Sequence, residues 1–152
     1  MSRNYKILVV DDEPTIRTAI SDYLKRFNFS VFEAVDGEEA KVVLKKEELD
    51  LVITDVDMPK FNGLELLSYV KEHNQKAEVI VITGYGTIEM AVEVMRLGAF
   101  IFLQKPIKLP DLKGQVEKAL GLMLDTKVAP ASIRNNIQKN AWSTGLKRTS
   151  EP

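Results

Sequence analysis

The sequence contains no cysteine, and its single histidine is His73. Disulfide bonds and thiolate zinc sites are therefore excluded, and His73 falls at the far end of a predicted helix, so no histidine is placed to act as a base. No apolar run approaches the ~20 residues that a membrane-spanning helix needs. The run at residues 7–10 is too short for a signal peptide and is ended by Asp11 and Asp12. We expect a cytoplasmic protein without membrane association.

Charged residues are unevenly distributed along the 152-residue chain. The net charge is −1, yet residues 1–124 contain 16 Lys and Arg against 20 Asp and Glu, whereas residues 125–152 contain five against two. This change of composition, with Pro130 close behind it, indicates a domain boundary. We expect one domain over residues 1–124, within the common size of ~100–150 residues, and a basic tail or linker over residues 125–152.

The predicted tail has weak patterns of its own. Ile133, Ile137 and Ala141 recur at helical spacing beside Trp142, which predicts a short amphipathic helix over residues 131–142. Five positive charges without interleaved aromatic residues are a weak indication of nucleic-acid binding. We favour a solvated linker, and both a stand-alone protein and a fragment of a longer one remain open.

Apolar runs and amphipathic stretches alternate five times along residues 1–124. The runs predict strands at residues 6–10, 30–34, 49–54, 78–83 and 100–103. The stretches predict helices at residues 14–27, 37–44, 63–72, 88–97 and 109–124. Crossovers between parallel strands are right-handed and must be covered by helices. We therefore expect an α/β fold with a doubly wound sheet of five parallel strands. For these strands we expect the flavodoxin-like order 2-1-3-4-5, one of the common doubly wound orders.

Two of these helices have apolar residues whose orientation we predict from periodicity. The first has an apolar stripe made of Ile16, Ala19, Ile20, Tyr23, Leu24 and Phe27. In the fourth, we expect the core-facing residues to be Ile88, Ala91, Val92 and Met95. Three apolar residues then remain for the surface, namely Met90, Val94 and Leu97. An exposed apolar patch often marks a partner site, although scattered surface apolar residues are also common.

Polar residues follow the ends of four predicted strands. They are Asp11 and Asp12, Asp55 and Asp57, Thr83, and Lys105. In a doubly wound sheet, ligands bind beyond the carboxyl ends of the strands, where the strand order reverses. The first and third strands are neighbours in the expected order, so Asp11, Asp12 and Asp55 should converge. A single acidic residue after a strand is more often a turn former, but the whole set at one edge indicates a functional site.

Three carboxylates in one cleft repel each other, by about 1 kcal/mol per pair at ~4 Å in water and about 4 kcal/mol at an effective dielectric of about 20. A hard divalent cation such as Mg²⁺ relieves this repulsion and also binds phosphate oxygens. Lys105 adds a compact positive charge, and Thr83 adds a hydroxyl donor. This combination is typical of phosphoryl transfer to an aspartate, in which catalysis is mostly positioning and charge neutralisation.

Four short segments resemble the signature segments of response-regulator receiver domains, the phosphoacceptor domains of two-component signalling. They are residues 9–14 (VVDDEP), 54–59 (TDVDMP), 81–84 (VITG) and 102–106 (FLQKP). Their order and spacing resemble the family over about residues 5 to 123. Residues 82–89 (ITGYGTIE) are similar to receivers of nitrogen-regulation-type transcription activators. One departure is Gly84, which stands where the family usually has alanine.

The resemblance implies a role for each aspartate of this edge. Asp55 would be the phosphoacceptor and one of the metal ligands. Asp12 would bind Mg²⁺ directly, and Asp11 would act mainly through a metal-bound water. The backbone carbonyl of Asp57 would complete the protein ligands, and Mn²⁺ could replace Mg²⁺.

The resemblance also implies a donor and a switch. Thr83 and Lys105 would contact the phosphoryl oxygens, Phe102 would be the switch aromatic, and the Lys105–Pro106 peptide would be cis. The phosphoryl group would come from a phosphohistidine of a sensor histidine kinase or a phosphotransfer protein. The chain would be a signalling receiver rather than an enzyme, because it would catalyse only its own phosphorylation and dephosphorylation.

Phosphorylation would change a surface made of the helix at 88–97, the strand at 100–103 and the helix at 109–124. The expected outcome is a phosphorylation-dependent homodimer through this surface. Nucleic acid would be reached only through an output domain, which this sequence does not contain.

Two other classes of function compete with this interpretation. Asp55-Val-Asp57 is similar to the nucleophile–acid pair of haloacid-dehalogenase-type phosphatases, but that pair should follow the first strand, where Asp11 and Asp12 stand. A flavin-binding module would need a phosphate-binding loop of Ser, Thr and Gly after the first strand, and the sequence has none there.

Overall fold

The computed structural model describes residues 4–58, 62–74, 76–84 and 86–122. Five strands form one parallel sheet in the order β2-β1-β3-β4-β5, which confirms the predicted doubly wound α/β fold. The strands are β1 (Lys6–Val10), β2 (Ser30–Ala34), β3 (Leu51–Asp55), β4 (Glu78–Thr83) and β5 (Ile101–Gln104). The helices are α1 (Pro14–Lys25), α2 (Gly37–Lys46), α3 (Gly63–His73), α4 (Ile88–Arg96) and α5 (Leu109–Ala119).

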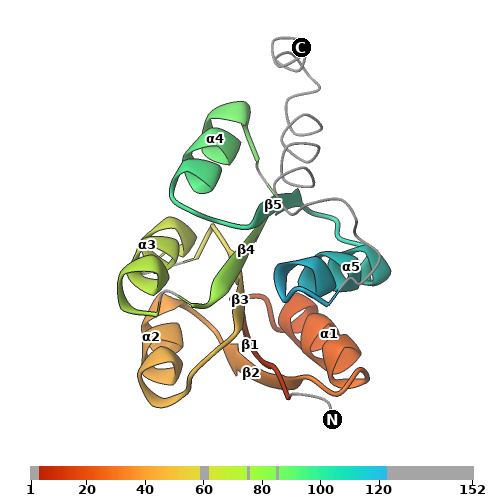
Figure 1. Cartoon of the computed structure of the whole chain (residues 1–152). Helices are drawn as coiled ribbons and strands as arrows, with labels where there is room; N and C mark the ends of the chain where they lie inside the picture. The colour runs from red at the N-terminus through yellow and green to blue at the C-terminus, as the bar shows by residue number, and fades with distance from the viewer. Residues whose placement is uncertain (1–3, 59–61, 75, 85, 123–152) are drawn as a thin grey trace.

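The helices cover both faces of the sheet and create two separate cores. Helices α1 and α5 lie on one face, and α2, α3 and α4 lie on the other (Figure 1). On the first face, Ile20 of α1 and Leu112 of α5 pack against buried strand residues. On the second face, Leu66 of α3 and Val94 of α4 do the same. None of the described helices is long and apolar enough to cross a bilayer.

The register of the sheet brings the carboxyl ends of the central strands to one edge. Val10, the last residue of β1, pairs with Thr54, and Asp55 pairs with Ile82 of β4. Strands β1, β2 and β4 have the predicted bounds. Strand β3 begins and ends later than predicted, so that Asp55 is its last residue rather than the first residue after it.

Helix α5 ends earlier than the predicted residue 124. It stops at Ala119, and Gly121 takes a φ of +74°, a conformation that residues with a side chain rarely adopt. The N–H of Leu122 then donates to the carbonyl of Glu117 over 2.8 Å, which closes the helix end. The predicted boundary at residues 124 and 125 and the predicted helix at residues 131–142 lie outside the described residues.

The predicted core-facing residues of two helices were partly wrong. Val92 of α4 is 37% exposed, whereas Val94, which we assigned to the surface, is fully buried. Ala91 and Val94 are one helical turn apart and face the sheet together, which turns Val92, one residue or ~100° further round than Ala91, towards solvent. In the first stripe, Ala19 is exposed, and Phe27 lies beyond the end of α1 with 39% of its surface exposed.

Candidate functional site

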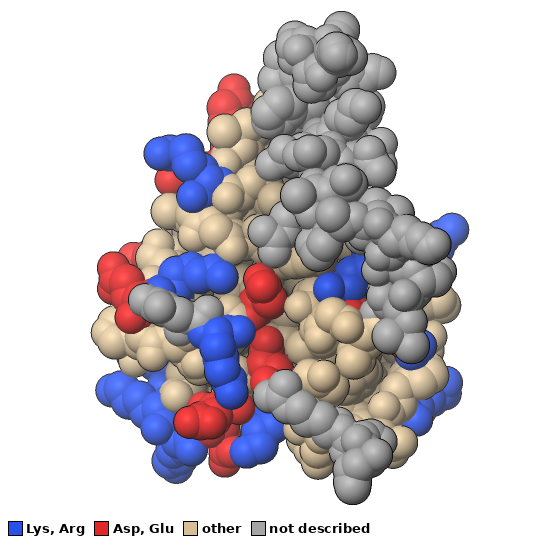
Figure 2. Space-filling model, viewed as in Figure 1, with Lys and Arg blue, Asp and Glu red and all other residues tan. Residues whose placement is uncertain are grey.

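Three aspartates from two neighbouring strands form an acidic cluster at the carboxyl edge of the sheet. Each of Asp11, Asp12 and Asp55 offers a carboxylate oxygen, and these oxygens lie within 4.8 Å of one another. Asp11 and Asp55 are buried, whereas Asp12 is exposed. Acidic side chains gather near the middle of the face seen in Figure 2, with basic side chains on either side. The predicted convergence is therefore present in the structure.

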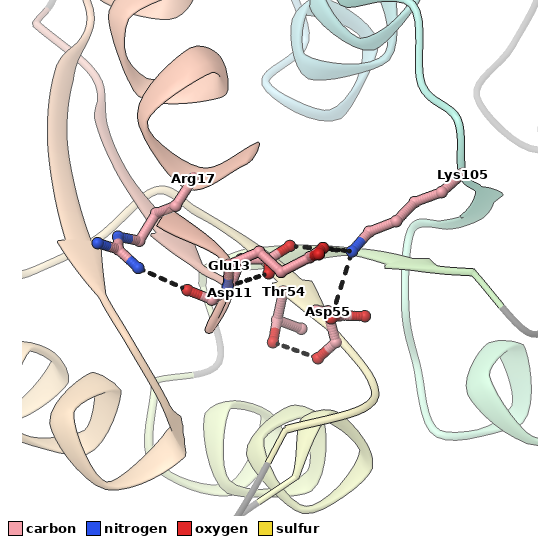
Figure 3. Close-up of polar contacts among 6 residues, drawn as sticks. All are labelled: Asp11, Glu13, Arg17, Thr54, Asp55 and Lys105. Atoms are coloured by element: carbon pink, nitrogen blue, oxygen red, sulfur yellow. Dashed lines mark hydrogen bonds and ion pairs between the residues drawn. The ribbon is translucent and has the colours of Figure 1, made fainter. Parts of the chain in front are cut away.

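Lys105, which follows the edge strand β5, contacts the acidic cluster. Its ammonium lies 3.2 Å from Asp11 Oδ2, 3.4 Å from Asp55 Oδ2 and 3.4 Å from Glu13 Oε1 (Figure 3). Burial disfavours its charged form, but the carboxylates of Asp11 and Asp55 outweigh burial and raise the pKa of Lys105 above its ordinary value. Lys105 is therefore a permanent cation at this edge, shared among three carboxylates.

The electrostatic environment of Asp55 opposes its charged form. Burial first, and the Asp11 carboxylate second, raise the pKa of Asp55 from 3.8 to about 6. Lys105 and the backbone of Asp57 act in the opposite direction without cancelling this rise. The carboxylate is thus ionised at neutral pH at the cost of a repulsion that a further cation would relieve.

One oxygen of Asp55 has no hydrogen-bond partner among the described residues. This atom, Oδ1, is buried, while Oδ2 contacts Lys105. Buried carboxylate oxygens normally accept hydrogen bonds or bind a metal. An all-oxygen donor set with an orphaned oxygen fits a hard divalent cation better than a soft one. The acidic cluster of Asp11, Asp12 and Asp55 could therefore hold a divalent cation.

The backbone of Asp55 is held from behind by neighbouring groups. The hydroxyl of Thr54 donates to the Asp55 carbonyl over 2.9 Å. Gly63, the first residue of α3, packs so closely that a Cβ there would lie 2.2 Å from the same carbonyl oxygen. Asn62 and Glu65 form a capping box that fixes this end of α3. The close approach of Gly63 to Asp55 was not predicted from the sequence.

The remaining predicted residues lie around the cluster. Thr83 is buried at the end of β4, and its carbonyl accepts from the Lys105 N–H over 2.8 Å. Asp57 is exposed after β3, and Phe102 is half-buried in β5. The Lys105–Pro106 peptide is cis, as the resemblance implied.

Arg17 was not identified from the sequence, because periodicity alone places it on a solvated helix face. It donates to the Asp11 carbonyl over 2.9 Å (Figure 3). It also pairs with Glu33 of β2 over 3.0 Å. Glu13 was likewise noticed only as part of a motif, although it contacts Lys105. Neither contact has a local sequence signal, since each depends on which strand lies next to which.

A parallel five-stranded sheet with this acidic edge and a following lysine defines a class of signalling domain. The chain belongs to the response regulator receiver domain family, which residues 7–117 match, and the domain is therefore a receiver of two-component signalling. This assignment replaces the phosphatase and flavin-binding alternatives.

Individual relatives agree with the family assignment. The chain is 38% identical over 122 residues to the response regulator protein PilR of Pseudomonas aeruginosa. The matched region covers 80% of this chain and 27% of that protein. It is 34% identical to the sporulation initiation phosphotransferase F of Bacillus subtilis, covering 78% of this chain and 96% of that one. The crystal structure of a response regulator receiver protein from Pseudomonas putida superposes with a TM-score of 0.73 at 34% identity, over 78% of this chain and 99% of that chain.

Proposed function

We propose that the chain accepts a phosphoryl group on Asp55 from a phosphohistidine of a sensor histidine kinase or a phosphotransfer protein. The observation that supports this most strongly is the buried, unpartnered Oδ1 of Asp55 beside two further carboxylates and Lys105. A carboxylate oxygen without a hydrogen-bond partner among the described residues, at the carboxyl edge of the sheet, is available to form a new bond.

The proposed transfer is a substitution at phosphorus. A carboxylate oxygen of Asp55 forms the new P–O bond while the P–N bond to the donor imidazole breaks, and the donor nitrogen keeps that bond's electron pair. Lys105 is placed to neutralise a phosphoryl oxygen, and the Thr83 hydroxyl would donate a hydrogen bond to another. The protein thus positions the reactants and balances charge rather than supplying a general base.

The residues of the acidic edge would hold one Mg²⁺ or, in its place, Mn²⁺. We assign Asp12 and Asp55 as direct ligands, the backbone carbonyl of Asp57 as a third, and Asp11 as a ligand through water. When bound, the ion would neutralise the carboxylates and the phosphoryl oxygens.

An apolar groove beside Lys105 supports a protein donor. Its volume is about 490 Å³, and Ile16 and Ala19 of α1 face Ile107 and Leu109 across it. A donor protein that packs an apolar surface there would bring its phosphohistidine to the neighbouring acidic edge.

We propose the surface of α4, β5 and α5 as the output. Phosphorylation would draw Thr83 towards the phosphoryl group and let Phe102 rotate, which favours a homodimer through this surface. On α4, Val92 is exposed and Met90 and Met95 are half-buried, so the apolar patch differs from the predicted one. We propose a receiver at residues 1–124 followed by a basic tail or linker at residues 125–152, and any contact with nucleic acid would require an output domain that is not part of this sequence.

Labelling with a small phosphodonor tests the assignment of Asp55. Wild-type protein in Mg²⁺ and acetyl phosphate should incorporate one phosphoryl group, and Asp55→Asn should incorporate none while remaining folded. Asp50→Asn is the matched control, because it makes the same change in another buried aspartate next to β3; it should be labelled normally. Undiminished labelling of Asp55→Asn would reject the proposal. Sedimentation with and without beryllofluoride, a phosphoryl mimic, tests the homodimer.

A further inference from the structure

Arg17 joins three parts of the fold at the acidic edge. It lies on α1, its Nε donates to Glu33 Oε1 of β2 over 3.0 Å, and its Nη1 donates to the backbone carbonyl of Asp11 over 2.9 Å. The side chain is only 15% exposed, so it is held in this arrangement rather than solvated. Both contacts use the planar fork of the guanidinium, which a lysine could not reproduce.

The bond to the Asp11 carbonyl determines the position of Asp12. The peptide between Asp11 and Asp12 is planar, so a hydrogen bond that holds its carbonyl oxygen also restricts the positions of the Asp12 nitrogen and Cα. The other groups of Asp11 are held as well: its N–H donates to the Ala34 carbonyl over 3.2 Å and its Oδ1 accepts from the Glu13 N–H over 2.9 Å. Asp12 itself is exposed. The orientation of its carboxylate therefore depends on the peptide that precedes it.

We propose that Arg17, anchored by Glu33, is a positioning residue for the metal site, because it holds the Asp11–Asp12 peptide so that the Asp12 carboxylate faces Asp55. The inference rests on the proposed function, since it concerns the cation of that site. It assigns no contact between Arg17 and the cation or the phosphoryl group.

The direction in which Mg²⁺ affinity changes when Arg17 is replaced distinguishes a positioning role from a purely electrostatic one. A guanidinium near a cation site repels the cation, so removing its charge would by itself strengthen Mg²⁺ binding. Removing a group that orients a metal ligand weakens metal binding, typically by about 10–100-fold. Arg17→Gln should therefore weaken Mg²⁺ binding by about tenfold, against the electrostatic expectation.

Titration of the full chain with MgCl₂ alone, at constant ionic strength and followed by the NMR shift of the Asp12 amide, measures this affinity. Arg17→Lys keeps the charge but loses the two-point geometry, so it should also bind Mg²⁺ more weakly than wild type. Glu33→Gln should weaken binding less, because a neutral acceptor still anchors Arg17. Arg26→Gln removes the same charge from the exposed end of α1 and should bind like wild type.

Unfolding midpoints in EDTA separate a positioning role from a structural one. A merely structural Arg17 would lower the midpoint of Arg17→Gln but leave the Mg²⁺ affinity of its folded state unchanged, which would overturn the proposal. Equal or tighter Mg²⁺ binding by Arg17→Gln, or equal weakening by Arg26→Gln, would overturn it too. A wild-type protein that binds no Mg²⁺ would overturn the proposed metal site, and the role of Arg17 with it.

Discussion

Two buried aspartates lie at opposite ends of the same strand and have opposite environments. Asp50, just before β3, accepts the Lys6 N–H over 2.9 Å, and its own N–H and carbonyl pair with Lys6 and Glu78. Asp55, at the other end of β3, has one oxygen without a partner among the described residues and a pKa raised to about 6. Burial alone therefore does not distinguish a structural carboxylate from a functional one.

The difference teaches where this fold places its unfavourable interactions. At the Asp50 end, backbone hydrogen bonds tie β1, β3 and β4 together, and the Lys6 N–H also donates to the Asp50 carboxylate. At the Asp55 end, like charges meet and Lys105 is shared among three carboxylates. A buried group with unsatisfied polar atoms is retained at a cost in stability, which is common where a site must bind a ligand.

The largest expected effect is the dependence of phosphoryl labelling, at the Asp55 end of β3, on a divalent cation. Excess EDTA should slow labelling of the wild type by at least about a hundredfold, because a bound cation contributes several kcal/mol of charge stabilisation and each 1.36 kcal/mol is tenfold in rate. Asp12→Ala should weaken Mg²⁺ binding more than Asp11→Ala does. Labelling rates with and without chelator provide the measurement, and equal rates would remove the metal from the mechanism.

The next largest effect should be on the pH dependence of stability, through the raised pKa of Asp55. In metal-free protein, the unfolded state loses the Asp55 proton near pH 3.8 and the folded state keeps it to about pH 6. The unfolded state thus binds fewer protons in this window, and Asp55 lowers the free energy of unfolding as pH rises through it, by about 3 kcal/mol in total. Asp55→Asn should lack this loss and be more stable at pH 7.

Urea unfolding of wild type and Asp55→Asn at pH 4, 5, 6 and 7 measures the difference between the two proteins. This comparison cancels the titration of carboxylates common to both. A difference that stays constant across the window would contradict the raised pKa of Asp55.

Removing the Asp50 carboxylate should have the reverse effect. Asp50→Ala leaves the Lys6 N–H without its acceptor, which should lower the free energy of unfolding by about 2 kcal/mol. The site at the other end of β3 should be labelled at the wild-type rate under conditions where the variant is folded. Loss of labelling in a folded Asp50→Ala protein would mean that the two ends are coupled.

The smallest expected effect is a change in the position of the Phe102 ring, the proposed switch between the acidic cluster and the output surface. A Cβ at Gly86 would lie 2.8 Å and 2.9 Å from two atoms of the Phe102 ring, whereas one at Gly84 would meet nothing within 4 Å. Gly86→Ala should therefore displace the ring and shift its NMR signals, and Gly84→Ala should not. Identical NMR signals of the Phe102 ring in the two variants would contradict the close approach of Gly86 to that ring.

Much of the fold could be predicted because its signals are local. The apolar runs of β1, β2 and β4 have the predicted bounds, and their alternation with amphipathic stretches predicts a doubly wound parallel sheet. Acidic residues and a lysine at strand ends predict that Asp11, Asp12, Asp55 and Lys105 converge. The orientation of α4 was less accessible, since Val92 and Val94 are equally apolar and only packing decides between them.

The sequence by itself determined the periodicity of the elements, the polar residues at the strand ends and hence the class of the domain. Tertiary structure alone decided which of the two buried aspartates at the ends of β3 has an oxygen without a partner among the described residues. It also decided which three carboxylates share Lys105 and that Arg17 donates to the Asp11 carbonyl. The reason is that these properties depend on distances between residues far apart in the chain, such as Lys105 and Asp11 at 94 positions. Hydrogen bonds and charge interactions act over a few ångströms, so only the packed sheet determines them.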